Sequence, residues 1–160
     1  MSRVKEWTDK QILNYYLGVK YSDYPKIFWE KMKPEIAGCK TIIDIGCGPG
    51  AFALQAAEAN FNVQAVDFNK KSLEALKEQS RGLKNLNIIY GNWLEVEVHK
   101  SDASVCAYSF GEEIGTLDGI KKIIDLTKKV AFLIAPFDLI QTDFLSKEVY
   151  HTSGIQPPSF

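Results

Sequence analysis

The sequence is poor in the two side chains that most often form disulfides or bind zinc. Its 160 residues include 3 cysteines and 2 histidines. Cys39, Cys47 and Cys106 are odd in number and lack CxxC spacing, which argues against a disulfide framework. His99 and His151 are far apart, so neither is expected to bind a metal, and His151 is expected to be a surface residue. We therefore expect no metal site and a reducing, cytoplasmic location.

Long apolar runs and an excess of positive charge are also missing. No apolar stretch approaches the ~18 residues of a membrane-spanning helix, and residues 1–10 lack the hydrophobic core of an export signal. With 19 basic and 20 acidic side chains the formal net charge is −1. No basic surface for a nucleic-acid backbone is indicated. Membrane and nucleic-acid partners are disfavoured, and a small-molecule partner is favoured.

The length of the chain fits one three-layer domain and is too short for two. Hydrophobic residues make up 46% of the sequence, enough for a substantial core. We expect a single domain over residues 1–160. Its parts are a helical leader (1–39), a core (40–136) and a tail (137–160).

The most informative segment is T-I-I-D-I-G-C-G-P-G at residues 41–50. Its β-branched residues are typical of a buried parallel strand. Gly46, Gly48 and Gly50 then allow the chain to turn tightly and to approach a ligand closely. The following helix, at about residues 50–59, would direct its free N–H groups toward that ligand. The pattern predicts a nucleotide-like cofactor at this turn.

The same turn also satisfies the dinucleotide fingerprint, with Gly46, Gly48 and Ala51 at its three key positions. Asp44 argues against that interpretation. The fingerprint requires no acid inside the strand, and a buried carboxylate costs several kcal/mol unless it is paired. A cationic ligand, or donors in the turn, would pair it. A nicotinamide-dependent protein is therefore the third hypothesis.

The segment D-I-G-C-G-P-G closely resembles the first motif of the class I S-adenosylmethionine-dependent methyltransferases. In that family this turn faces the amino acid end of the cofactor. The resemblance covers residues 41–135 well and the two ends poorly. It implies a cofactor-binding turn made of Asp44, Gly46, Cys47, Gly48 and Gly50.

Asp67 follows the predicted second strand, residues 62–66, and lies about 20 residues beyond the glycines, where α/β nucleotide sites bind ribose hydroxyls. The segment V-D-F-N resembles the family's second motif. This implies that Asp67 binds the ribose and that Phe68 lies beside the adenine. By itself, Asp67 would equally fit a solvated turn. Asn69 is expected to cap a helix over residues 70–81.

The predicted third strand, residues 87–90, ends in Gly91-Asn92-Trp93. The family usually has an acid or amide here that reaches the adenine amino group. The resemblance implies that Asn92 binds the adenine and that Trp93 offers it an aromatic face. A plain turn with Trp93 in the core is the alternative.

The predicted fourth strand, residues 101–108, leads to Ser109 at the carboxyl edge of the sheet, where ligands bind in open α/β sheets. Ser109 is therefore included among the cofactor-binding candidates. The family's N-P-P-Y and Pro-Cys signatures are absent here, and Cys106 is expected to be a buried, inert thiol. Glu112 and Glu113 are candidate general bases, although adjacent acids at a helix start more often interact with its dipole. No catalytic residue is identified.

Strands and helices alternate along the chain, with a further helix expected at residues 116–129 and a fifth strand at 130–135. The inward side chains expected on that helix are Ile120, Ile123, Ile124 and Leu126. The alternation predicts a doubly wound, three-layer, Rossmann-like α/β fold. Its mostly parallel sheet is expected to have the strand order 3-2-1-4-5.

The leader is expected to form helices at residues 9–17 and 25–33 and is rich in aromatic residues. Tyr24, Phe28 and Met32 recur at helical spacing, which favours packing on a core. The alternative is a flap that closes over the cofactor and substrate. Trp29, which lies off that stripe, is the preferred flap residue.

The tail is expected to add one helix at residues 142–150 and lacks room for the sixth and seventh strands of the family. The fifth strand would then be a bare edge, which predicts a homo-oligomer or a fragment of a longer methyltransferase. The resemblance implies S-adenosylmethionine-dependent methyl transfer to an unidentified small molecule, with S-adenosylhomocysteine as product. The alternative is a non-catalytic cofactor-binding or regulatory module.

Overall fold

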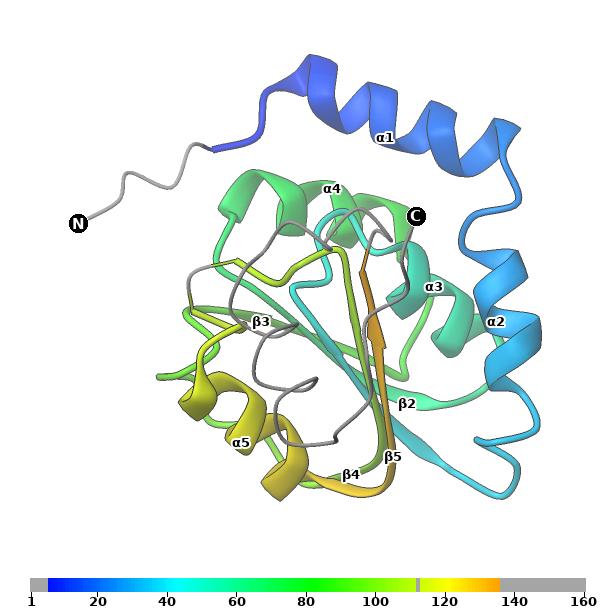
Figure 1. The fold of residues 1–160 in the computed structure, drawn as a ribbon. Coiled ribbons are helices and arrows are strands. Elements are labelled where there is room, and N and C mark those ends of the chain that lie inside the picture. Colours follow the sequence, from blue (N-terminus) through cyan, green and yellow to red (C-terminus); the bar gives the residue numbers. More distant parts are fainter. Residues whose placement is uncertain (1–5, 112, 136–160) are drawn as a thin grey trace, which may run out of the picture.

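The computed structural model describes residues 6–111 and 113–135, and its core is one five-stranded sheet with helices on both faces (Figure 1). The strands are β1 (Thr41–Ile45), β2 (Asn62–Asp67), β3 (Leu86–Tyr90), β4 (Ser101–Ala107) and β5 (Thr127–Ile134). The helices are α1 (Asp9–Tyr21), α2 (Lys26–Met32), α3 (Ala51–Glu58), α4 (Lys70–Gln79) and α5 (Leu117–Leu126). The strand order is β3-β2-β1-β4-β5, and all neighbouring strands are parallel. The predicted fold class and strand order are confirmed.

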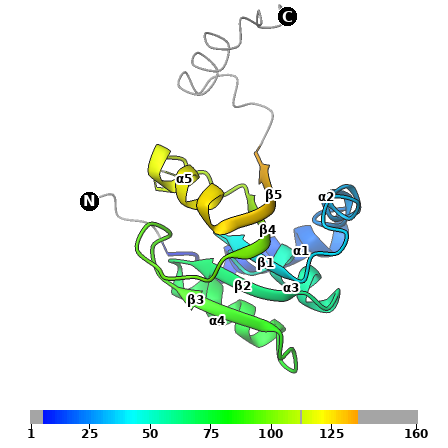
Figure 2. The ribbon, with the colours of Figure 1, turned by 90° about the horizontal axis from the view of Figure 1, so that it is seen from below.

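Alternation along β1 separates two apolar cores, one on each face of the sheet. Ile42 packs with residues of α2, α3 and α4, whereas Ile43 and Ile45 pack with Ile123 of α5. Figure 2 shows α5 on one side of the sheet and α2, α3 and α4 on the opposite side. Asp44 shares the side of Ile42, because side chains two residues apart on a strand point the same way. Its carboxylate is therefore directed toward α2 and α3.

The ends of the helices follow local chemistry. The Asn69 side chain accepts a hydrogen bond from the Ser72 amide at 3.0 Å, so the predicted cap of α4 is confirmed. A capping box between Thr8 and Gln11 opens α1. This helix continues to Tyr21, beyond the predicted end at residue 17, because no proline interrupts it before the Ser22 C-cap.

The helix expected at residues 116–129 is shorter than predicted. It ends at Leu126, and Thr127 already belongs to β5, where it pairs with Ser101. Ile124 was expected to face inward, but 64% of it is exposed. A ten-residue helix on a sheet buries a narrow stripe, here Gly119 and Ile123 at i and i+4, and Ile124 falls outside it.

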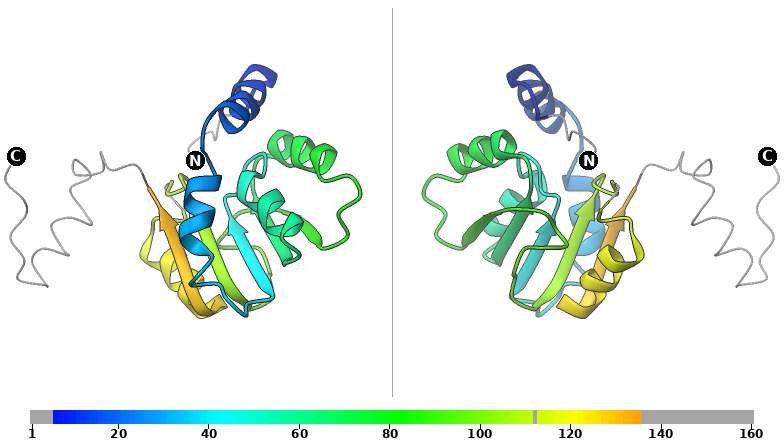
Figure 3. Two further views of the ribbon diagram at one scale, coloured as in Figure 1. Left: turned by 90° about the vertical axis from the view of Figure 1, so that its right-hand side faces the viewer. Right: turned by 90° about the vertical axis from the view of Figure 1, so that its left-hand side faces the viewer.

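Helix α1 lies beyond the carboxyl ends of the strands, across the edge of the sheet where ligands bind in this fold class (Figure 3). No residue of α1, all of which the structure describes, is fully buried. In the described ranges, no helix has the length and apolar character needed to cross a membrane. The helix expected at residues 142–150 lies outside the described residues.

Candidate functional site

The glycine turn after β1 uses its three glycines for different reasons. All three have positive φ, with values of 67° at Gly46, 52° at Gly48 and 94° at Gly50. A Cβ on Gly46 would collide with the Ser109 side chain, and a Cβ on Gly50 would collide with Leu76. A Cβ on Gly48 would meet no atom within 4 Å. The outer glycines are therefore required by packing, whereas the backbone of Gly48 borders open space.

Asp44 is a buried acid within the β1 strand, only 2% exposed. Its Oδ2 atom has no hydrogen-bond partner among residues 6–111 and 113–135. Burial raises the pKa of this carboxyl to about 7, a hydrogen bond from the Ala53 amide opposes the rise, and the Asp67 charge adds to it. A buried carboxylate oxygen that borders a cavity and receives no hydrogen bond is suited to a cationic group.

Asp67, at the end of β2, fastens the glycine turn to the neighbouring strand. Its carboxylate accepts hydrogen bonds from the Gly48 amide at 2.8 Å and from the Asn69 amide at 2.8 Å. Burial raises the pKa of Asp67, and the amides of Asn69, Gly48 and Phe68 offset part of that rise. A carboxylate has about four lone-pair positions, so two donors leave acceptor capacity for ligand hydroxyls.

Two cavities meet at Gly46 and Ser109, which line both of them. The Ser109 hydroxyl donates to the Gly46 carbonyl at 2.7 Å and also contacts the Ala107 carbonyl at 3.0 Å, so β4 holds the turn from the other side. The first cavity has a volume of about 230 Å3 and is lined by Gly46, Val66, Asp67, Phe68, Gly91, Trp93, Ser109, Gly111, Glu113 and Ile114. The second has a volume of about 470 Å3 and is lined by Trp7, Tyr15, Tyr24, Phe28, Asp44, Gly46, Cys47, Gly48, Pro49, Phe52, Ala107, Tyr108 and Ser109.

The structure brings most of the predicted site residues to these cavities. Those that line one or both are Asp44, Gly46, Cys47, Gly48, Asp67, Phe68, Trp93 and Ser109. Gly50 lines neither and instead forms the N-cap of α3. Asn92 also lines neither, and its Oδ1 accepts a hydrogen bond from the Leu94 amide at 2.8 Å. Adenine recognition by Asn92 therefore stays a prediction.

Trp93 combines both of the roles considered for it, because it lines the first cavity and is also buried in the core next to α5. Its indole N–H donates to the Gly119 carbonyl at 3.0 Å. The ammonium of Lys122 lies 4.9 Å from the centre of its ring and donates to the carbonyls of Trp93 at 2.7 Å and Val96 at 2.6 Å. Sequence reasoning missed Lys122, because nothing local links it to a loop 26 residues earlier.

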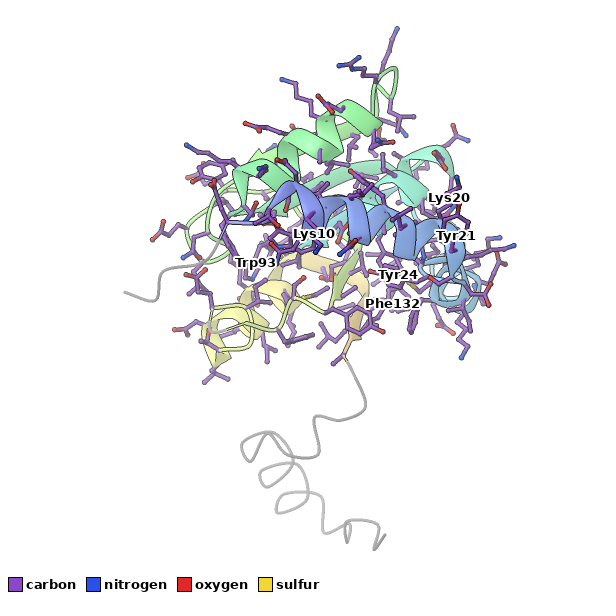
Figure 4. The ribbon with its side chains drawn as sticks, turned by 90° about the horizontal axis from the view of Figure 1, so that it is seen from above. Lys10, Lys20, Tyr21, Tyr24, Trp93 and Phe132 are labelled. Atoms are coloured by element: carbon purple, nitrogen blue, oxygen red, sulfur yellow. The ribbon has the colours of Figure 1, made fainter. Side chains whose placement is uncertain are left out.

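The choice of Trp29 as a flap residue was wrong. Trp29 is 3% exposed and packs edge-on against Phe61, because it lies on the face of α2 that is turned to the core. Tyr24 and Phe28 are half-buried, pack on the core and also line the second cavity. Figure 4 shows Tyr24 and Trp93 well apart beneath α1, on the sides of the second and first cavities respectively.

Two further tyrosines complete this wall: Tyr15, one of the aromatic residues noted in the leader, and Tyr108, which sequence reasoning missed. The Tyr15 hydroxyl accepts a hydrogen bond from the Ala51 amide at 3.0 Å, which ties α1 to the start of α3. Tyr108 has a φ of 56°, a left-handed conformation that bulky residues rarely adopt. Its position beside Ser109, just after β4, could have identified it from the sequence as a residue of the site. The partner of Tyr15 could not be predicted, because this contact spans 36 residues.

The remaining candidates are acids and thiols. Glu113 lines the first cavity, so its role as a general base stays a prediction, and Glu112 lies outside the described residues. Cys47 and Cys106 are buried free thiols. Burial raises the pKa of Cys106 to about 12, which fits the inert thiol predicted for this position.

Comparison with known proteins gives one family match and one curated relative. A family model described as a methyltransferase domain matches residues 37–153. An uncharacterized protein of Haemophilus influenzae is 30% identical over 124 residues, which is 76% of this chain. The chain spans 45% of the length of that protein.

Solved structures share the fold at low sequence identity. A SAM-dependent methyltransferase from Aquifex aeolicus has a TM-score of 0.66 at 15% identity, covering 96% of this chain and 92% of its own. An S-adenosylmethionine-dependent methyltransferase from Clostridium acetobutylicum has a TM-score of 0.61 at 18% identity, covering 83% and 60%. Coclaurine N-methyltransferase bound to N-methylheliamine and SAH has a TM-score of 0.52 at 20% identity, covering 83% and 37%.

Proposed function

Because this chain belongs to the methyltransferase domain family, we propose that it binds S-adenosylmethionine at the glycine turn and transfers the methyl group to a small molecule. Each of the two cavities would hold a different part of the bound ligands. The first would hold the adenosine part of the cofactor, and the second would hold its amino acid end together with the methyl acceptor.

The observation that carries this proposal is the unpaired Oδ2 of Asp44. The amino acid end of S-adenosylmethionine carries an ammonium group, which would pair this oxygen and remove the cost of burying it. Gly48 offers open space beside the same acid, where a ligand can approach the backbone. The unpaired acceptor of Asp44 and the open space at Gly48 therefore fit the amino acid end of this cofactor.

The adenosine part would lie in the first cavity. The spare acceptor positions of Asp67 would bind the ribose hydroxyls. Val66, Phe68, Trp93 and Ile114 give the cavity an apolar lining, which suits the faces of an adenine ring. When bound, the cofactor supplies a methyl group on a positively charged sulfur, which is already an activated electrophile.

The residues of the chain would mainly hold the acceptor in line and exclude water, since alignment alone can supply a large part of the rate. The aromatic side chains of the second cavity would serve both tasks. A base is required only if the acceptor must lose a proton before attack. Glu113, which lines the first cavity, is the candidate base, and we assign no other.

A non-catalytic cofactor-binding module is the second candidate, since it would keep Asp44, Gly48 and Asp67. The size of the second cavity favours transfer, because its aromatic wall extends beyond the turn and provides a place for an acceptor. The free thiols Cys39, Cys47 and Cys106 are consistent with the reducing, cytoplasmic location that we propose.

The proposal is tested by calorimetric titration with S-adenosylhomocysteine, 5′-methylthioadenosine and NADH. Methylthioadenosine shares the adenosine thioether but lacks the amino acid end. We expect S-adenosylhomocysteine to bind at least about tenfold more tightly than methylthioadenosine, because a hydrogen bond to a charged group contributes about 1.5–3 kcal/mol. NADH should show no binding in its own titration.

The Asp44→Asn variant is the matched control, since it keeps the shape of the side chain and removes its charge. We expect it to bind the two adenosine ligands about equally. Equal binding of both by the wild-type protein, or tighter binding of NADH, would contradict the cofactor assignment. Tight binding of S-adenosylhomocysteine without turnover on an acceptor panel would favour the non-catalytic module.

A further inference from the structure

The second cavity has a wall built largely of aromatic rings from the leader, from α3 and from the residue that follows β4. These rings are Trp7, Tyr15, Tyr24, Phe28, Phe52 and Tyr108. Tyr24 is central among them, with its ring centre 5.6 Å from that of Phe52, 5.8 Å from that of Tyr108 and 6.1 Å from that of Phe28. All three pairs pack edge to face, so the wall is a connected cluster rather than separate side chains.

The described side chains of this wall carry negative but no positive charge. Asp44 is its acid, and none of the described residues that line the cavity is a lysine, arginine or histidine. Burial raises the pKa of Tyr15 and Tyr24, and the Asp44 charge contributes to both rises, so these hydroxyls stay neutral. In the proposed function Asp44 pairs with the ammonium of the cofactor, which leaves the aromatic faces to attract a cationic acceptor. None of these side chains would pair the carboxylate or phosphate of an acceptor.

Tyr108 places one ring of the cluster at the rim. About half of it, 52%, is exposed, although its ring packs on Tyr24 and Phe28. Its left-handed backbone brings the ring there at the end of β4, beside the Ser109 that separates the two cavities. The rim of the cavity therefore presents an aromatic side chain that solvent and ligands can reach.

We infer that the methyl acceptor is a small organic amine with an apolar, ring-sized body, which binds as its ammonium ion against the rings of Tyr24, Phe28 and Tyr108. This inference rests on the proposed function and adds the chemical class of the acceptor. Cations gain from aromatic faces, and apolar cavities with few polar groups favour ligands of drug-like size.

Methyl transfer to an amine can be written as two steps in which all atoms and charges balance. The bound ammonium first releases one proton to water at the solvent-reached rim, which leaves a neutral nitrogen with a lone pair. The nitrogen then forms a bond to the methyl carbon while the carbon–sulfur bond breaks and its electron pair stays on sulfur. The product is a methylated ammonium and a neutral thioether, so no oxidant or reductant is required.

The first experiment compares three ligands of one shape, 2-phenylethylamine, 2-phenylethanol and phenylacetate, by calorimetry on the full chain at pH 7 with saturating S-adenosylhomocysteine. We expect the amine, a cation at this pH, to bind about tenfold more tightly than the alcohol. Phenylacetate should show no binding. If the alcohol or the carboxylate binds as tightly as the amine, or if the amine does not bind, the inference is wrong.

The second experiment asks whether the rings carry this preference. Tyr108→Phe keeps the ring, whereas Tyr108→Asn removes it with a residue that tolerates the left-handed backbone. We expect Tyr108→Phe to bind the amine normally and Tyr108→Asn to weaken its binding about two- to fivefold, the loss of one exposed cation–π contact. Tyr21→Asn, which removes an exposed ring outside the cavity, is the control and should change nothing.

The two proposals fail in different ways. Titration with S-adenosylhomocysteine alone is run on the same protein samples. If that ligand does not bind, the proposed function falls. If it binds but the preference for the amine is missing, only the proposed acceptor class is wrong. The same holds if Tyr108→Asn lowers the affinity for the amine no more than Tyr21→Asn does.

Discussion

The Asp44 carboxyl is maintained at an energetic cost that only a ligand would offset. The rise of its pKa from 3.8 to about 7 corresponds to roughly 4 kcal/mol against the charged form in the folded protein. Because the folded-state pKa is the higher one, the stability from proton binding is fully present below about pH 4. It is lost as the pH rises through about 7. A cationic ligand reverses this balance, since it stabilises the charged form.

Gly48 provides a test of the turn itself, with Gly82 as a matched control. Both glycines have positive φ, 52° and 94°, and a Cβ on either would meet no atom within 4 Å. Gly48 lines the second cavity, whereas Gly82 lies after α4 and lines neither cavity described above. Alanine should therefore strain both backbones similarly, by about 1–2 kcal/mol.

We predict that Gly48→Ala lowers the affinity for S-adenosylhomocysteine at least about tenfold, because the added methyl group occupies the ligand's side of the turn. Gly82→Ala should lose comparable stability and bind normally. Urea unfolding and calorimetry on both variants give the two quantities. Normal binding by Gly48→Ala would show that the ligand does not lie against this part of the backbone.

At the scale of elements, the loop after β3 is held by a cation from helix α5. Lys122 of α5 donates to the carbonyls of Trp93, Leu94 and Val96, at 2.7, 3.3 and 2.6 Å. Burial lowers the pKa of Lys122, and the Glu97 charge offsets part of that effect. The contact fixes the loop that carries Trp93 into the wall of the first cavity.

We predict that Lys122→Met destabilises the fold by about 1–3 kcal/mol, because three carbonyls lose a charged donor. The affinity for S-adenosylhomocysteine should fall with it, since the Trp93 loop loosens. Faster amide exchange at Leu94 and Val96 would show the loosening directly. Lys121→Met, an exposed neighbour on the same helix, is the control. Equal behaviour of the two variants would mean that Lys122 does not hold the loop.

At the scale of the whole molecule, the described residues leave β5 at one edge of the sheet, paired only with β4. Leu133 on this strand is 48% exposed. Edge strands with apolar side chains promote association unless they are covered or charged. Self-association through β5 is therefore still a prediction.

We predict that light scattering across a concentration series detects association of the wild-type protein and that Leu133→Lys reduces it. The introduced charge would remain exposed in the monomer, whereas association would bury it against a strand of a second molecule. Leu117→Lys places the same change at an exposed position on α5 and should leave association unchanged. A wild-type protein that is monomeric at every concentration would rule out this surface.

The sequence by itself determined the sheet and the turn. Alternating strand and helix patterns define a parallel doubly wound order, because crossover handedness leaves few other topologies. Gly46, Gly48 and Gly50 lie in a strand-to-helix turn with positive φ, as their spacing predicted. Asp44 was recognised as a buried acid because its neighbours in the strand are β-branched. These features depend on residues within a few positions of one another.

The tertiary structure decided which distant side chains meet at the site. Periodicity placed Phe28 on the core face of α2 and Trp29 off it, but the core contacts both side chains, so the flap residue was chosen wrongly. The contact of Ser109 with Gly46 spans 63 residues. Such contacts depend on how β4 and the leader dock against β1, and that docking is set by packing of the whole chain rather than by any local pattern. The cofactor turn was therefore readable in the sequence, whereas the aromatic acceptor cavity became visible only in the fold.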